Sequence, residues 1–221
     1  MHYNNVMKIL TPKFLHAEFF MRDEKIAESL LPQIRPLQVH KDNIIIINDE
    51  NINEYARPKV PEADGIFLKT ANAEASLRFA DCAPVLIWSE KFAMILHSGY
   101  KGTVLNISGK GVKLFDEPAE NLHAWVGPCI GRENYCRDIN DEWTQKGLET
   151  FHKENYDIKE NEGKIYFDLA GEIRSQLLEK NLAEENIILS GVDTFTEKDC
   201  YSYRRGDKTE RMTLKIQTGR S

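Results

Sequence analysis

The chain has 221 residues, of which 41% are hydrophobic, and a formal net charge of -6. This length and composition suffice for one domain with a sizeable core, and the acidic balance argues against a general nucleic-acid-binding surface, which needs basic stripes. No run reaches the roughly 18 apolar residues of a membrane span, and the first residues lack a signal-peptide pattern. We therefore expect a cytoplasmic protein without a membrane partner.

The first half of the chain predicts mainly strands. Apolar residues at helical spacing predict one helix over 23–31, which Pro32 ends. The continuous β-branched run at 44–47 is typical of a buried strand, and the polar segment 51–61, with its two prolines, predicts a loop. The predicted strands cover residues 14–22, 42–48, 63–70, 74–79, 84–88 and 92–96.

The second half mixes helices and strands. Helices are predicted over 103–115, 141–156 and 168–181, the last capped by Asp168. Strands are predicted over 122–126, 164–167 and 187–192, followed by a basic tail with 201–205 and 211–216. Because no repeat, linker or domain boundary interrupts this mixture, we expect one compact α/β or α+β domain over 1–221, with mixed β-sheets flanked by helices.

Three candidate metal ligands, His40, Cys82 and His97, follow apolar segments. Two imidazoles and one thiolate leave a fourth tetrahedral position open, which is typical of a catalytic zinc site. The spacing alone is a weak signal, because the chain has no CxxC or HExxH motif. The alternative interpretation is a buried thiol with two partly exposed histidines, which fits the expectation that most of the four cysteines are reduced and buried.

Several basic residues are candidates for binding an anion. Lys101 lies in a glycine-rich turn, where backbone amides at a helix start favour an anion. The pair Arg204-Arg205 could bind phosphate or carboxylate through planar guanidinium groups. Arg22 is a further candidate with a weaker local signal. The alternatives are a tight turn at the glycines and a solvated basic tail.

Six segments, in this order along the chain, resemble one known family. They are Gln38-Val39-His40, Ala63-Asp64-Gly65 with Thr70, Ala80-Asp81-Cys82-Ala83-Pro84-Val85, His97-Ser98-Gly99-Tyr100-Lys101-Gly102, Gly127-Pro128-Cys129-Ile130-Gly131 and Ser202-Tyr203-Arg204-Arg205. The chain resembles the zinc-dependent purine nucleoside phosphorylases, formerly described as the laccase-domain or multicopper polyphenol oxidase family. The older copper-oxidase description fits less well, because a multicopper site needs many histidines and this chain has six.

The resemblance implies a phosphorylase that acts on adenosine, inosine, guanosine or methylthioadenosine with phosphate, and that also deaminates adenosine. It implies that His40, Cys82 and His97 bind Zn²⁺ and that Arg205 acts in catalysis or substrate binding. Phosphate and substrate would also contact Lys101, Arg22 and Gln38. A small-molecule nucleoside and phosphate would then be the only partners, and a homodimer is compatible with the sequence.

Some positions depart from the family pattern. The segment His-Ser-Gly-Tyr-Lys-Gly replaces His-Ala-Gly-Trp-Arg-Gly, so Lys101 keeps the charge but lacks the bidentate fork. Asp193 and Glu210 stand where the family has cysteine and glycine. Two alternatives therefore stay open: a cysteine hydrolase or amidase with Cys82 as nucleophile and His97 or His40 as base, and a binding protein with a degenerate site.

Overall fold

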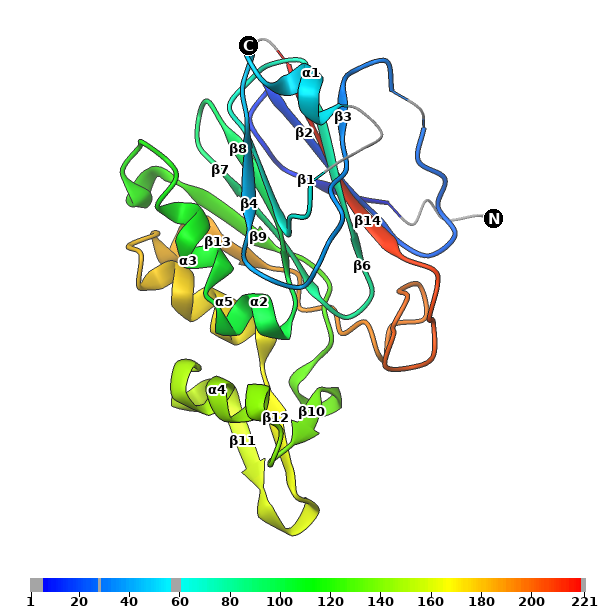
Figure 1. Ribbon diagram of the computed structural model, residues 1–221, viewed down its shortest axis with the longest axis vertical. Coiled ribbons are helices and arrows are strands. Elements are labelled where there is room, and N and C mark those ends of the chain that lie inside the picture. Colours follow the sequence, from blue (N-terminus) through cyan, green and yellow to red (C-terminus); the bar gives the residue numbers. More distant parts are fainter. Residues whose placement is uncertain (1–5, 28, 57–60, 220–221) are drawn as a thin grey trace.

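The computed structural model describes residues 6–27, 29–56 and 61–219. Within these residues the chain forms two large β-sheets, a small third sheet and five α-helices (Figure 1). The sheets mix parallel and antiparallel pairs: β4 and β13 pair in parallel with their neighbours, whereas β7 and β8 pair antiparallel. The predicted fold class, a single compact domain with mixed sheets and helices, is confirmed.

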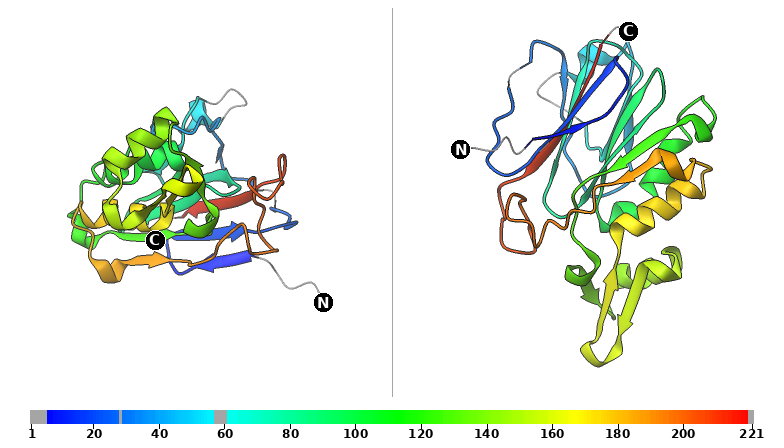
Figure 2. Two further views of the ribbon diagram at one scale, coloured as in Figure 1. Left: turned by 90° about the horizontal axis from the view of Figure 1, so that it is seen from below. Right: turned by 180° about the vertical axis from the view of Figure 1, so that it is seen from behind.

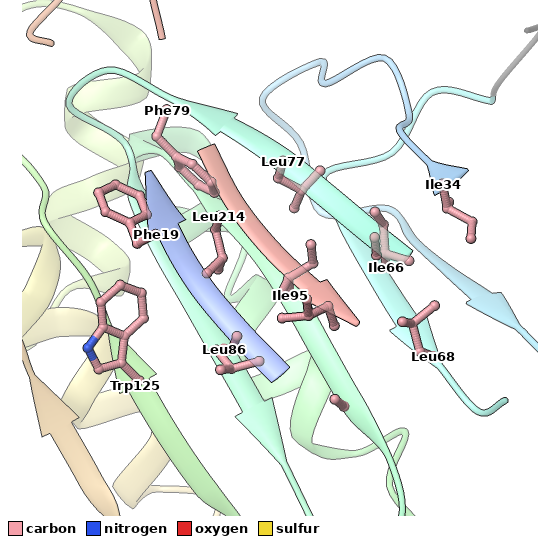
Figure 3. Close-up of a cluster of buried hydrophobic side chains, with 14 of the residues drawn as sticks. Phe19, Ile34, Ile66, Leu68, Leu77, Phe79, Leu86, Ile95, Trp125 and Leu214 are labelled. Atoms are coloured by element: carbon pink, nitrogen blue, oxygen red, sulfur yellow. The ribbon is translucent and has the colours of Figure 1, made fainter. Parts of the chain in front are cut away.

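The two large sheets face each other. The six-stranded sheet has the order β13 (Ile187–Leu189), β9 (His123–Val126), β7 (Ala83–Trp88), β8 (Ala93–Ser98), β5 (Gly65–Leu68) and β4 (Ile44–Ile47). The five-stranded sheet has the order β1 (Val6–Ile9), β2 (Leu15–Phe20), β14 (Met212–Thr218), β6 (Glu74–Phe79) and β3 (Gln33–Ile34). Figure 3 shows Phe19, Leu77 and Leu214 of the five-stranded sheet against Leu86, Ile95 and Trp125 of the other. This layer between the sheets is the largest part of the core.

Helices cover the other face of the six-stranded sheet (Figure 2). The strands β7 and β8 are buried at every position, since one face meets the second sheet and the other meets α3 (Ile107–Val112) and α5 (Leu169–Leu178). Strands covered on both faces are expected to be continuously apolar. Asp168 caps α5 as predicted, because its carboxylate accepts the backbone N–H of Gly171 at 2.8 Å.

The third sheet extends from one end of the molecule, at the bottom of Figure 1. It contains β10 (Cys136–Asp138), β12 (Lys164–Phe167) and β11 (Tyr156–Lys159), with α4 (Glu142–Thr150) beside it. Its own apolar cluster includes Phe151 and Phe167, and Tyr100 of α2 (Tyr100–Val104) joins them. This unit is therefore attached to the main body through α2.

The helix predicted over 23–31 is wrong: no helix forms in its described residues. Asp23 has a positive φ of 62°, and its backbone N–H and carboxylate both bond the hydroxyl of Tyr201. Leu30 is fully exposed, whereas Ile26 and Leu31 are half-buried, so the three residues do not form one buried apolar face. Tertiary contacts with the loop around Tyr201 decide the local conformation, and helical spacing in one segment does not reveal them.

Two other predicted helices were too long. Residues 103–115 form parts of α2 and α3, because Asn106 adopts a left-handed φ of 57° and caps α3 by accepting the N–H of Gly109. The helix predicted over 141–156 ends at Thr150, so that Phe151 can enter the core in an extended conformation. The first helix is thus divided by a local cap at Asn106, and the second ends where Phe151 packs into the core.

Three further segments differ from the prediction. Residues 212–218 of the supposed basic tail form β14, which lies between β2 and β6 in its sheet. The predicted loop at 51–61 contains the short helix α1 (Ile52–Tyr55), and 57–60 lie outside the described residues. Strand β4 is an edge strand on which Ile46 is 38% exposed. In the described part of the chain, no helix combines the length and apolar character needed to cross a bilayer.

Candidate metal centre and substrate cavity

His40, Cys82 and His97 lie together at the end of the two large sheets. His40 precedes β4, Cys82 lies in the connection from β6 to β7, and His97 lies in β8. One ligand atom from each side chain can be chosen so that all lie within 4.8 Å of one another. His97 is buried, Cys82 is half-buried and His40 is exposed, so the cluster is open on the His40 side. Among the described residues, this is the one group of three or more such side chains that could hold a metal ion.

Asp64 holds two members of this cluster in place. Its fully buried carboxylate accepts the backbone N–H groups of His40 at 3.0 Å and Lys41 at 2.7 Å, and also lies 2.8 Å from Nδ1 of His97. The contact with a carboxylate favours the tautomer of His97 that carries its proton on Nδ1. Nε2 of His97 then presents its lone pair to a ligand. A carboxylate behind a histidine is a common arrangement at metal sites.

Two backbone features, at Gly99 and Asp81, fix the position of Cys82. A Cβ atom at Gly99 would lie 2.6 Å from Sγ of Cys82, so this position must be glycine for the thiol to keep its place. Asp81, next to Cys82, has a positive φ of 81°, which is uncommon for a residue other than glycine. Its carboxylate accepts the hydroxyl of Thr194 at 2.8 Å and the backbone N–H of Arg204 at 2.7 Å. These bonds hold the strained turn and tie the loop around Arg204 to the cluster.

The electrostatics of the cluster favour a thiolate. Burial raises the pKa of the Cys82 thiol, but the charge of His97 and hydrogen bonds with both imidazoles outweigh burial and lower this pKa. Burial lowers the pKa of His97, but the Cys82 thiolate and Asp64 raise it more strongly. The negative charge on sulfur is thus stabilised by a neighbouring cation, and a metal ion could provide the same stabilisation.

The donor set fits a metal ion. A thiolate and two imidazoles are soft or borderline ligands, and three of them leave a coordination position open. The rings of His40 and His97 lie 4.8 Å apart at 79°, and the open side of the cluster faces a cavity. The residues present can therefore hold a metal ion that a substrate in the cavity could reach.

This cavity has a volume of about 600 Å³. Two tyrosines, Tyr135 and Tyr203, line it, and Tyr203 is 52% exposed. Three arginines also line it, together with all three candidate metal ligands. The full set is Pro36, Leu37, Gln38, His40, Arg78, Ala80, Asp81, Cys82, His97, Tyr135, Tyr203, Arg204 and Arg211. Aromatic rings, cations and a metal set thus face the same space.

Of the five other candidate residues from the sequence, two line the cavity beside the metal set, Arg204 and Gln38. The side-chain amide of Gln38 bonds the backbone of Arg78, accepting the N–H at 2.8 Å and donating to the C=O at 2.9 Å. Lys101 does not line the cavity, and its ammonium lies 4.8 Å from the ring centre of Trp143.

Arg205 and Arg22 also lie outside the cavity lining. Both guanidinium groups bond the carboxylate of Asp207, and both donate to the carbonyl of Cys200. Arg205 donates further to the carbonyls of Thr194, Phe195 and Glu197. These two arginines therefore hold the loop that carries Tyr203 and Arg204.

Sequence reasoning missed Arg78, Arg211 and Tyr135 as cavity residues, and assigned Asp64 no role. Arg78 carried a readable signal, because it is the exposed residue in a strand that is otherwise buried. Tyr135 carried none, since it reaches the cavity from a segment far away in the sequence, and Arg211 stood out only as part of the basic cluster around Arg204. The pairing of β14 with β6 and the position of the third sheet place them there.

Comparison with known proteins places this architecture in a family. Residues 23–219 match the family model described as multi-copper polyphenol oxidoreductase laccase. The chain belongs to this family. The resemblance predicted from the sequence segments is thereby confirmed. The match includes all three candidate metal ligands and every residue that lines the cavity.

Relatives of this laccase-family chain carry a different name. A purine nucleoside phosphorylase of Rickettsia conorii is 33% identical over 181 residues, which cover 76% of this chain and 68% of that protein. A purine nucleoside phosphorylase of Aquifex aeolicus is 28% identical over 182 residues, which cover 82% of this chain and 80% of that protein. The crystal structure of the hypothetical protein YfiH of Bacillus licheniformis has the same fold, with a TM-score of 0.83 and 21% identity. The match covers 98% of this chain and 100% of that chain.

Proposed function

We propose that this protein is a zinc-dependent purine nucleoside phosphorylase that also deaminates adenosine. The observation that carries the proposal is the His40–Cys82–His97 set, which opens into a cavity lined by tyrosines and arginines. The names of the relatives support the phosphorylase part of this proposal. A cavity of about 600 Å³ lies within the range of small-molecule sites. The substrates would be adenosine, inosine, guanosine or methylthioadenosine with phosphate.

Each part of the cavity has a role in this proposal. His40, Cys82 and His97 would hold zinc, and zinc supplies Lewis acidity toward a substrate oxygen or nitrogen. Tyr135 and Tyr203 offer rings on which a purine can stack, since aromatic faces favour such contacts. Gln38 fixes the backbone of Arg78, and Arg205 with Arg22 fixes the loop of Tyr203. In phosphorolysis, a phosphate oxygen bonds to C1′ of the ribose, the C1′–N9 bond breaks, and the base leaves with a proton.

The test is to incubate zinc-loaded protein with adenosine and phosphate and to separate the products by chromatography. Adenine and ribose 1-phosphate are expected from phosphorolysis, and inosine or hypoxanthine from deamination. The variant Cys82→Ala should lose most of its zinc and its activity, whereas His16→Ala, which removes an exposed imidazole outside the metal set and the cavity lining, should keep both. Wild-type protein with stoichiometric zinc and none of these products would overturn the proposal.

A second candidate is a cysteine hydrolase or amidase. The observation in its favour is the lowered pKa of the Cys82 thiol beside His97, which resembles an activated nucleophile and its base. The two candidates differ in their need for metal. If hydrolysis of amide or ester substrates increases when a chelator removes the metal, the hydrolase is favoured. If the release of purine base from a nucleoside is lost on the same treatment, the phosphorylase is favoured.

A further inference from the structure

Ion pairing separates the arginines of this protein into two groups. Every described arginine outside the cavity pairs with a carboxylate, as the pairs of Arg22, Arg35, Arg132, Arg137, Arg174 and Arg205 show. The three that line the cavity, Arg78, Arg204 and Arg211, form no ion pair with a carboxylate of the described residues. Their charges are thus unneutralised by protein and face the same space as the metal set.

Sheet register brings two of these arginines together. Arg78 of β6 lies directly opposite Thr213 of β14. Arg211 comes two positions before Thr213 and therefore shares its face of the sheet. Diagonal neighbours on one face of an antiparallel pair are about 7–8 Å apart, which is within reach of long side chains. Two like charges at this spacing repel each other unless an anion lies between them.

Two carboxylates close to these arginines in the sequence or in the cavity are already engaged. Asp207, four residues before Arg211, is bonded by Arg22 and Arg205. Asp81 lines the cavity, but one of its oxygens accepts the hydroxyl of Thr194 and the other the backbone N–H of Arg204. These two acids are thus held by other donors, and the exposed Glu210 next to Arg211 forms no ion pair with a described residue. The guanidinium groups stay available to a ligand.

Local contacts also hold each cavity arginine in place. The side chain of Gln38 bonds both backbone groups of Arg78. The guanidinium of Arg204 donates to the carbonyl of Cys136 at 3.1 Å and lies 5.3 Å from the ring centre of Tyr135. The guanidinium of Arg211 donates to the carbonyl of Glu210 at 2.6 Å. Each contact uses part of a guanidinium or only its backbone, so donors remain for an anion.

We propose that Arg78, Arg204 and Arg211 form a subsite for a tetrahedral phosphate group next to the metal set. Several guanidinium forks suit the oxygens of phosphate, and a dianion neutralises their repulsion. The group could be free phosphate, the co-substrate of the function proposed above, or a phosphate carried by the substrate itself. The inference rests on the proposed function only in the first case. It assigns the anion to residues other than Lys101, Arg22 and Arg205.

Binding is tested without any reaction, by calorimetric titration of zinc-loaded protein with inorganic phosphate and with adenosine 5′-monophosphate. The variants are Arg78→Gln and Arg211→Gln, and the matched control is Arg174→Gln, which removes an ion-paired arginine on α5. Each cavity variant should raise the dissociation constant of one or both ligands by about 10- to 100-fold. The control should leave both constants unchanged, and circular dichroism and zinc content should match wild type in all three variants.

The two ligands distinguish the two sources of the anion. If the variants weaken the binding of free phosphate and raise its KM while the KM for adenosine stays constant, the anion is the co-substrate. If they weaken only the binding of adenosine 5′-monophosphate, the anion is part of the substrate. Folded, zinc-loaded variants that bind both ligands as wild type does would overturn the subsite. Wild type that binds phosphate but forms no products would contradict the proposed function and leave the subsite standing.

Discussion

Asp64 supports the metal set from behind, through the backbone that carries His40 and through Nδ1 of His97. Asp64→Asn keeps the size of the side chain but replaces one oxygen with a donor. It should therefore weaken the orientation of His97. We expect the zinc dissociation constant to rise by about 10- to 100-fold, as for other residues that orient metal ligands.

Competition with a coloured chelator measures this constant. Asp116→Asn is the matched control, since Asp116 is exposed, pairs with Lys69 and belongs neither to the cluster nor to the cavity lining. Equal zinc affinity of Asp64→Asn and wild type would show that Asp64 does not orient the ligands.

Gly99 defines how closely the chain approaches Cys82. In Gly99→Ala the new methyl group would lie 2.6 Å from Sγ, so the thiol must leave its present position in the cluster. We expect a clear loss of zinc affinity. Gly219→Ala is the comparison, because there a Cβ atom meets only an ordinary contact at 3.9 Å. Zinc content after dialysis against a weak chelator checks the prediction, which fails if both variants retain zinc equally.

Strand β14 shows, at the scale of elements, that the C-terminal segment belongs to the core. Leu214 is fully buried between the two large sheets. Leu214→Ala should therefore lower the free energy of unfolding by about 2–5 kcal/mol. Leu10→Ala removes the same atoms from a side chain that is 92% exposed and should change it by less than about 0.5 kcal/mol. Urea denaturation compares the two, and equal effects would contradict the buried position of β14.

The link between α4 and α5 depends on pH. Burial lowers the pKa of His152, but its hydrogen bond with the buried carboxylate of Glu172 and the charges of Glu172 and Glu179 raise it more. A histidine whose pKa is higher in the folded state binds its proton more tightly there. It stabilises the fold fully below its ordinary pKa of about 6.5, and this stabilisation disappears as the pH rises through the raised value.

The free energy of unfolding lost in His152→Gln should accordingly be larger at about pH 6 than at about pH 9. His123→Gln is the control, because His123 stacks on Trp88 and pairs with no described carboxylate. Denaturation curves at both pH values provide the measurement. A loss that is the same at both would show that the ion pair does not contribute.

For the whole molecule, the sequence predicted what local patterns determine. Alternating and continuous apolar runs indicated the strands of the six-stranded sheet, and Asp168 indicated the start of α5. The helix over 23–31 failed because contacts with Tyr201 decide that conformation. The metal set could be proposed from three separate segments only through the family resemblance. Of the cavity arginines, only Arg204 was proposed as an anion ligand from the sequence, because Arg78 and Arg211 become neighbours only when β6 pairs with β14.

The three metal-binding candidates come from separate parts of the chain, before β4, between β6 and β7, and within β8. An ion bound to all three would act as a cross-link, which closes loops that are open in the unfolded chain. By mass action, free metal then adds to folding stability according to its concentration relative to the dissociation constant. If the site binds metal, the melting temperature of this protein should rise with the occupancy of the site, even when no substrate is present.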